Sequence, residues 1–254
     1  MLGCKSVGGK KNIGTTVTMK SSRWANRINR FMRVKPICYA VFHVRYFYFT
    51  KIKRALRAYD DQLGVAEREH NFRAIHDGKP SDRILGLVLP LSVIDRMTPE
   101  STVLAVGCRY ETDLLYLAAY GFSPRNIRGL DIFSYSPWVD LGNMHKMPYG
   151  DSSWDAVMLG WVLPYSSEPE LAAREIVRVT RPGGLVAIGI TYYPEEGAGH
   201  LLKDQPRFGR ERRNRTVDGM LDLFGDHVET VYFRHDVSDP NHQGPCLVVF
   251  SIRK

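Results

Sequence analysis

The 254-residue sequence has few cysteines, and their spacing argues against two kinds of cysteine site. Structural zinc sites normally use closely spaced cysteine pairs, and disulfide frameworks are typical of small, cysteine-rich secreted chains. Here the cysteines stand far apart, with no pair separated by two residues: Cys4, Cys38, Cys108 and Cys246. We therefore expect no metal site, no disulfides and a reducing compartment, which favours the cytoplasm.

Acidic residues are missing from the first 59 positions, which hold 14 Lys or Arg. The rest of the chain carries 21 basic and 27 acidic residues, so a cationic arm precedes a mildly acidic body. This asymmetry is typical of a chain that meets an anionic partner. We expect the arm either to lie peripherally on an anionic membrane surface or to pack on its own domain, and nucleic acid is the less favoured partner.

Apolar runs long enough to span a bilayer are lacking as well. The run "ILGLVLPLSVI" (84–94) is too short and contains Pro90, so core packing is its expected use. Residues 20–35 can form an amphipathic helix that Pro36 ends. Its apolar side carries Trp24, Ile28, Phe31 and Met32. This helix is expected at a membrane surface or against the body of the protein.

From about residue 81, apolar runs bounded by turn residues alternate with helical segments, which is typical of parallel βαβ units. Strands are expected at 102–107, 126–132, 138–143, 155–163, 185–190, 227–236 and 246–252. Helices are expected at 112–121, 166–180 and 216–225, and "RPGG" (181–184) is expected to be a turn. The sequence thus predicts a basic N-terminal extension over 1–80, partly disordered and then helical, and an α/β domain over 81–254.

Glycines are scarce where a nucleotide-binding turn would need them. Gly107 ends the first expected strand, but Arg109 and Glu111 stand where further glycines would let a ligand approach the backbone. The missing GxGxxG disfavours a nicotinamide-dependent oxidoreductase. Asp131 follows Gly107 by 24 residues, at the end of the second strand, where an acid can accept hydrogen bonds from ribose hydroxyls or simply cap a turn.

The stretch "GNMHKMPYGDSSWDAVMLGWVLPYSSEPELAAREIVRVTRPGGLVAIGI" (142–190) resembles class I S-adenosylmethionine-dependent methyltransferases, particularly the small-molecule, type 11-like kind. The likeness extends over roughly residues 85–254. It implies a Rossmann-like α/β fold with a mostly parallel seven-stranded sheet whose last strand is antiparallel. It also implies S-adenosylmethionine as cofactor and methyl transfer to a small-molecule or biosynthetic-intermediate acceptor.

The resemblance further implies which positions meet the cofactor. Asp131 matches the ribose-binding acid, Asn143 and Met144 match the turn that meets adenine, and Gly160 and Trp161 close the fourth strand. The full set is Gly107, Cys108, Arg109, Asp131, Ile132, Asn143, Met144, Gly160 and Trp161. Structural roles are the alternatives here as well: Asn143 could form a turn beside a core Met144, and Trp161 could fill the core.

Three departures from the family pattern bear on the site. Ala105 replaces the acid that usually helps to orient the methionine ammonium group, Arg109 and Glu111 replace glycines, and only 12 positions separate Asp131 from Asn143, so the second helix is nearly lost. We interpret the turn as modified: Arg109 would pair with the cofactor carboxylate, and Glu111 or Asp113 with its ammonium group.

The alternative is a non-catalytic, methyltransferase-like binding or scaffold protein, in which Arg109 fills a degenerate pocket. No catalytic residue is assigned, because no candidate base lies in a diagnostic motif. The candidates near the expected mouth of the site are His145, Tyr165, Tyr192, Tyr193 and His200.

Overall fold

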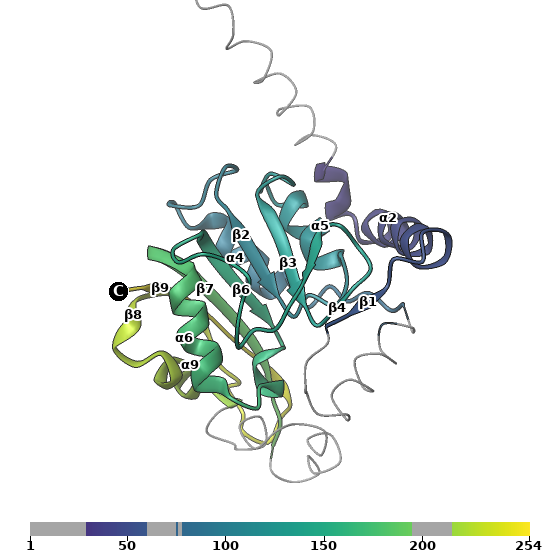
Figure 1. Ribbon diagram of the computed structural model, residues 1–254. Coiled ribbons are helices and arrows are strands. Elements are labelled where there is room, and N and C mark those ends of the chain that lie inside the picture. The colour runs from purple at the N-terminus through teal and green to yellow at the C-terminus, as the bar shows by residue number, and fades with distance from the viewer. Residues whose placement is uncertain (1–28, 60–74, 76–77, 195–214) are drawn as a thin grey trace, which may run out of the picture.

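The computed structural model describes residues 29–59, 75, 78–194 and 215–254, and a seven-stranded sheet forms its centre (Figure 1). The strand order is β5-β3-β2-β6-β7-β9-β8, and β9 runs antiparallel to both of its neighbours while the other pairings are parallel. The strands are β2 (Val103–Val106), β3 (Ile127–Asp131), β5 (Val139–Leu141), β6 (Trp154–Gly160), β7 (Thr180–Tyr192), β8 (Val228–His235) and β9 (Gly244–Ile252). The predicted fold class is confirmed.

Helices cover both faces of this sheet, so the strands are buried on two sides. Successive residues of a strand point to opposite faces, and Val103 accordingly joins one core while Leu104 joins the other. The helices α4 (Leu85–Val93) and α5 (Thr112–Ala119) pack in the first core. The helices α6 (Pro169–Val179) and α9 (Val217–Phe224) pack in the second and lie in front of the sheet in Figure 1.

The N-terminal part of the described chain is helical and packs on α5. It comprises η1 (Arg30–Arg33), α2 (Lys35–Phe47) and the π-helical turn η2 (Tyr48–Ile52). Most of the helix predicted over 20–35 lies outside the described residues, and its described end, η1, stops at Arg33, shortly before Pro36. Pro36 lies in the first turn of α2, where its missing N–H leaves no hydrogen bond unmade. The division of the chain at residue 80 stays a prediction.

The connection between β3 and β5 contains no helix, as the short spacing predicted. Instead β4 (Phe133–Ser134) follows β3 directly and pairs antiparallel with β1 (Arg57–Ala58) from the N-terminal segment. A strand from the extension thus lies beside the region that supplies Asp131.

The "RPGG" stretch is not the turn that the sequence predicted. β7 begins at Thr180, which pairs with Trp154, and the next paired residue is Leu185, opposite Ala156. Residues 181–184 therefore form a bulge within the strand. Gly183 has φ +72°, a conformation that glycine adopts without steric cost, so the same residues that signal a turn here let the strand bulge and continue.

Candidate ligand-binding site

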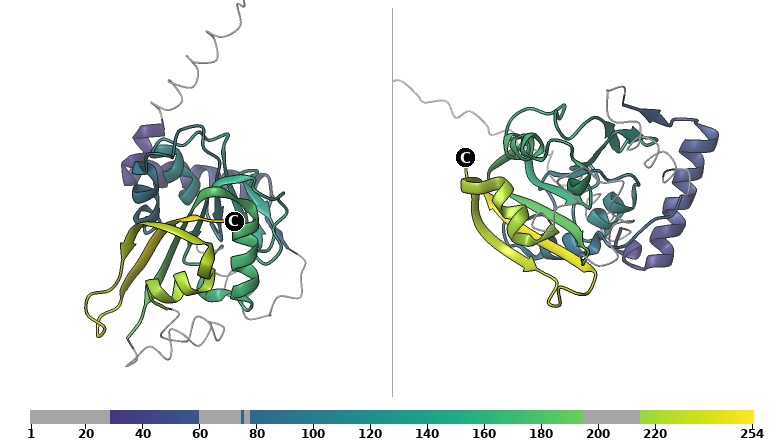
Figure 2. Two further views of the ribbon diagram at one scale, coloured as in Figure 1. Left: turned by 90° about the vertical axis from the view of Figure 1, so that its left-hand side faces the viewer. Right: turned by 90° about the horizontal axis from the view of Figure 1, so that it is seen from below.

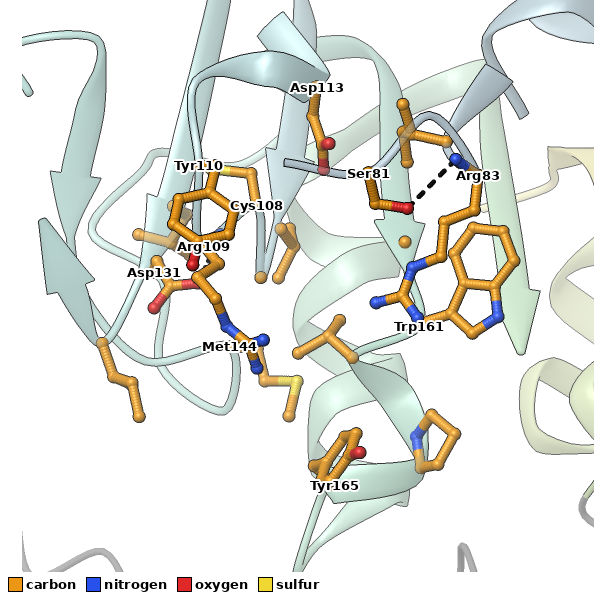
Figure 3. Close-up of a pocket in the computed structure, with 18 of the residues that line it drawn as sticks. Ser81, Arg83, Cys108, Arg109, Tyr110, Asp113, Asp131, Met144, Trp161 and Tyr165 are labelled. Atoms are coloured by element: carbon orange, nitrogen blue, oxygen red, sulfur yellow. Dashed lines mark hydrogen bonds between the residues drawn. The ribbon is translucent and has the colours of Figure 1, made fainter. Parts of the chain in front are cut away.

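A pocket of about 330 Å³ lies beyond the carboxyl ends of the adjacent strands β2, β3 and β6 (Figure 3). This is where open α/β sheets bind ligands. All nine positions expected to meet a cofactor line this pocket: Gly107, Cys108, Arg109, Asp131, Ile132, Asn143, Met144, Gly160 and Trp161. The sequence analysis missed a further wall, Lys79, Ser81 and Arg83, because the segment before α4 carries no recognisable motif.

Gly107 turns the chain sharply at the end of β2. Its φ is +70°, and its N–H donates to the carbonyl of Leu130 on β3 at 2.8 Å. A Cβ added at Gly107 would lie 2.4 Å from the Cβ of Val162, which is far inside van der Waals contact. Glycine is therefore required twice over, by the backbone conformation and by the packing of the loop that follows β6.

Asp131 ties two loops together while lining the pocket. Its Oδ2 accepts a hydrogen bond from the N–H of Arg109, and its Oδ1 accepts one from the N–H of Phe133, each at 3.0 Å. Each carboxylate oxygen has a second lone pair, so Asp131 keeps acceptor capacity toward a ligand. Burial raises the pKa of Asp131, and the hydrogen bonds from the backbone oppose that rise.

Asp113 and Arg83 place opposite charges on one side of the pocket, and Figure 3 shows the carboxylate of Asp113 directed into it. Burial raises the pKa of Asp113 to about 7, although the nearby Arg83 acts to lower it. The guanidinium of Arg83 stacks 4.7 Å from the ring centroid of Trp161, which fixes its position at the pocket wall.

The fold has a counterpart among solved structures. The crystal structure of the cyclase SpnF aligns with a TM-score of 0.50 over 85% of this chain and 96% of that one, at 15% identity. At this identity the likeness concerns the fold. Residues 104–188, which run from β2 through β7 and supply most of the pocket, match the family described as a methyltransferase domain. The segment 104–188 is therefore similar to a methyltransferase domain, and the strand order is that of the class I methyltransferase fold.

Curated relatives match parts of the chain. An uncharacterized methyltransferase of Schizosaccharomyces pombe is 34% identical over 88 residues, which is 32% of this chain and 32% of that protein. A demethylmenaquinone methyltransferase of Streptomyces griseus is 25% identical over 114 residues, 44% of each chain. The chain therefore spans about a third to under a half of the length of these relatives.

A buried ion pair fixes the glycine-poor turn of this domain in place. Glu111 is fully buried, and its carboxylate accepts two 2.7 Å hydrogen bonds from Arg45 of α2 and a further one from the hydroxyl of Ser136. Its N–H donates to the hydroxyl of Tyr135 at 3.1 Å. The hypothesis that Glu111 meets a ligand ammonium group is wrong, because its carboxylate faces α2 and Glu111 does not line the pocket.

Two pocket residues other than glycine have a left-handed backbone. Arg109 has φ +25°, and its side chain extends from the turn toward Met144 (Figure 3). Trp161 has φ +61°; its backbone N–H donates to Gly189 at 2.8 Å, and its indole N–H donates to the hydroxyl of Thr191 at 2.9 Å. Such strained positions gather at functional sites, where the surrounding structure holds them in place.

Three further pocket residues also have structural contacts. Asn143 is mostly buried and its Oδ1 accepts from the N–H of His145 at 3.0 Å, so its side chain shapes its own turn. His145 also lines the pocket, and its Nε2 lies 2.7 Å from the hydroxyl of Ser166. The buried Cys108 lies under the turn, where its Sγ would be 2.4 Å from a Cβ added at Gly129.

The tyrosines considered as bases differ in whether they line the pocket. Tyr165 and Tyr193 line the pocket. Tyr192 does not, because it is buried in the core on the α6 side and its hydroxyl donates to the carbonyl of Pro240 at 3.0 Å. His200 lies outside the described residues.

Proposed function

We propose that the methyltransferase domain binds S-adenosylmethionine in this pocket and transfers its methyl group to a small-molecule acceptor. The observation that carries the proposal is the link between two strand ends: the N–H of Arg109, just after the Gly107 turn, donates to Asp131 at the end of β3. This link sets the turn beside an acid with spare acceptor capacity, which is the arrangement that holds a nucleoside.

The charged residues of the pocket fit the two ends of such a cofactor. Asp131 is placed to accept hydrogen bonds from ribose hydroxyls. Asp113 is a buried carboxylate, and a bound cation would stabilise its ionised form. It therefore fits the ammonium group of the cofactor and would do the work of the strand-one acid that is Ala105 in this chain. Arg109 and Arg83 both line the pocket and can pair with the cofactor carboxylate.

The bound cofactor would supply an electrophilic sulfonium methyl group. The chain's own contribution is to position the reactants, since an in-line displacement depends chiefly on alignment. One wall of the pocket is aromatic and can exclude water from the reacting groups; it consists of Trp161, Tyr165 and Tyr193. The guanidinium of Arg83 stacks on Trp161 of this wall. His145, with its Nε2 at Ser166, is the pocket residue best suited to move a proton from an acceptor that arrives protonated.

A second candidate, a non-catalytic binding or scaffold protein, is favoured by the side chain of Arg109, which occupies space that a glycine would leave to the ligand. The two functions predict opposite results for Arg109→Gly. If Arg109 pairs with the cofactor carboxylate, the variant binds S-adenosylmethionine roughly tenfold more weakly or worse, as expected for losing one charged hydrogen bond.

Calorimetric titration of the full chain with S-adenosylmethionine makes this comparison, with the exposed Arg125→Gly as the control for charge alone. Unchanged or stronger binding by Arg109→Gly would contradict the carboxylate contact. Binding gained only in Arg109→Gly, with none in the wild type, would favour the scaffold protein.

A further inference from the structure

The N-terminal helical segment leaves a row of apolar side chains exposed to solvent. Val44 is 70% exposed, Ile52 61% and Phe47 58%. Ile37 and Tyr48 are exposed as well. The spacings between positions 37, 44, 47 and 48 are those of one helix face, and η2 continues it to Ile52. We call Ile37, Val44, Phe47, Tyr48 and Ile52 the exposed stripe.

The helix cannot turn this stripe inward, because its other face already anchors it to the methyltransferase domain. Cys38 and Phe42 are completely buried in the core that contains α5. Arg45 pairs with the buried Glu111, and the hydroxyl of Tyr46 donates to the carbonyl of Ile75 at 2.6 Å. The stripe therefore remains on the outside, and α2 lies on the side of the molecule away from the C-terminus (Figures 1 and 2).

The charged side chains at the C-terminal end of the stripe are cations. Lys51, Lys53 and Arg54 are exposed at its C-terminal end, and the ammonium of Lys53 lies 5.7 Å from the ring centroid of Tyr48. Within the part of the chain that the structure describes, no carboxylate forms an ion pair with these three cations. Residues 1–59 as a whole contain no Asp or Glu.

We propose that the exposed stripe docks on an anionic lipid surface, with its apolar side chains in the boundary between headgroups and acyl chains and with Lys51, Lys53 and Arg54 on the lipid phosphates. Aliphatic side chains together with exposed cations on one helix are the combination that binds this interface. Of the helices in the described ranges, none is long and apolar enough to cross a bilayer.

A nucleic acid fits the stripe less well. Single strands bind where aromatic faces stack on the bases beside a cationic groove. Three of the five stripe residues, Ile37, Val44 and Ile52, are aliphatic and offer no stacking face. Phe47 and Tyr48 are its aromatic members, whereas Tyr46 and Phe49 of the same segment pack against the core. Acyl chains accept aliphatic and aromatic side chains alike.

Docking would also orient the ligand-binding pocket. Lys35 at the start of α2 pairs with Asp82 at 2.7 Å, next to Arg83 in the pocket wall. The anchored helix and this wall thus belong to one unit, and a docked α2 fixes the pocket at a set position relative to the bilayer. The docking proposal does not depend on methyl transfer, and its test involves no cofactor.

Flotation of the full chain with vesicles tests the proposal. We expect the wild type to float with phosphatidylcholine vesicles that contain phosphatidylserine, and to float far less with phosphatidylcholine alone or at high salt. The double variant Val44→Ser, Phe47→Ser should lose roughly tenfold or more of its partition coefficient, because two exposed apolar side chains no longer reach the acyl boundary. Neutralising Lys51 or Lys53 should cost about fivefold each.

The matched control is Val93→Ser, Val231→Ser, which removes two exposed apolar side chains from α4 and β8. It should float like the wild type, and circular dichroism should show every variant folded. Equal flotation of the stripe variant and the control would overturn the proposal. Binding to single-stranded DNA without binding to vesicles would overturn it too, and would assign the cations to nucleic acid.

Discussion

Arg45 of α2 and Glu111 of the turn after β2 form a bidentate ion pair across 66 residues of sequence, with both N–O distances at 2.7 Å. The carboxylate is fully buried, whereas the Arg45 side chain keeps 35% of its exposure. The pair fastens the N-terminal helix to the turn that begins at Gly107. A residue that looks like the loss of a glycine from a binding motif is therefore a structural anchor for that motif.

Replacing Arg45 by Met should destabilise the protein by about 3 kcal/mol, because Glu111 would be left buried without its partner. Urea unfolding followed by circular dichroism measures the change. The double variant Arg45→Met, Glu111→Met should recover most of the loss, since neither charge is then left unpaired. The control is Lys35→Met, which breaks an exposed pair with Asp82 and should cost less than about 1 kcal/mol. Equal losses for the Lys35 and Arg45 variants would show that burial adds nothing to the Arg45 pair.

Gly107→Ala should be severely destabilising and should also abolish ligand binding. The φ of +70° strains any L-residue, and the new Cβ would overlap Val162. Gly225→Ala is the matched control, because Gly225 also has a positive φ, +50°, but nothing lies within 4 Å of its added Cβ. Strain alone should cost about 1–3 kcal/mol at Gly225, and the Gly107 variant should lose clearly more in urea unfolding. Similar losses at both positions would mean that the Val162 contact relaxes easily.

Asp113 should make stability and binding depend on pH. Its pKa is raised from 3.8 to about 7 in the folded protein, so between these values the native state holds a proton that the unfolded state has released. The free energy of unfolding contributed by Asp113 therefore falls as pH rises from 4 to 7 and is level above that. Unfolding of Asp113→Asn should lack this component, which appears as the difference between the two pH profiles. Parallel profiles would contradict the raised pKa.

The carboxylate of Asp113 should also make cofactor affinity depend on pH. If the ionised Asp113 pairs with the ammonium group of S-adenosylmethionine, binding at pH 6 must release a proton. Affinity should then fall by up to about tenfold per pH unit below 7. Calorimetry at pH 6 in buffers of different ionisation enthalpy counts the released protons. Asp113→Asn should release none from this position, and an unchanged proton count in that variant would assign the release elsewhere.

Much of the fold could be predicted from the sequence because its strands are buried on both faces. Runs such as Val103–Val106 are continuously apolar, and a terminal glycine and an acid mark the ends of β2 and β3. The resemblance to class I methyltransferases implied the nine expected positions, and all nine line one pocket at the carboxyl ends of neighbouring strands.

The rest depended on partners that are distant in sequence. The negative charge of Glu111 suggested a contact with the ligand ammonium group. Its actual role depends on Arg45, and no local sequence pattern connects the two residues. Arg83 lines the pocket and stacks on Trp161, which lies 78 positions later, and no sequence spacing connects the two residues. The "RPGG" bulge shows a further limit, since a glycine with positive φ serves a turn or a bulge equally well.

The most direct test is calorimetric titration of the full chain with S-adenosylhomocysteine, repeated on Asp131→Ala. A matched control, Asp140→Ala, removes a carboxylate of β5 that does not line the pocket. We expect the wild type and the control to bind at micromolar ligand. We expect Asp131→Ala to bind roughly a hundredfold more weakly or not at all, because two hydrogen bonds to a charged acceptor are lost. No binding by the folded wild type at millimolar ligand would contradict the proposed cofactor site.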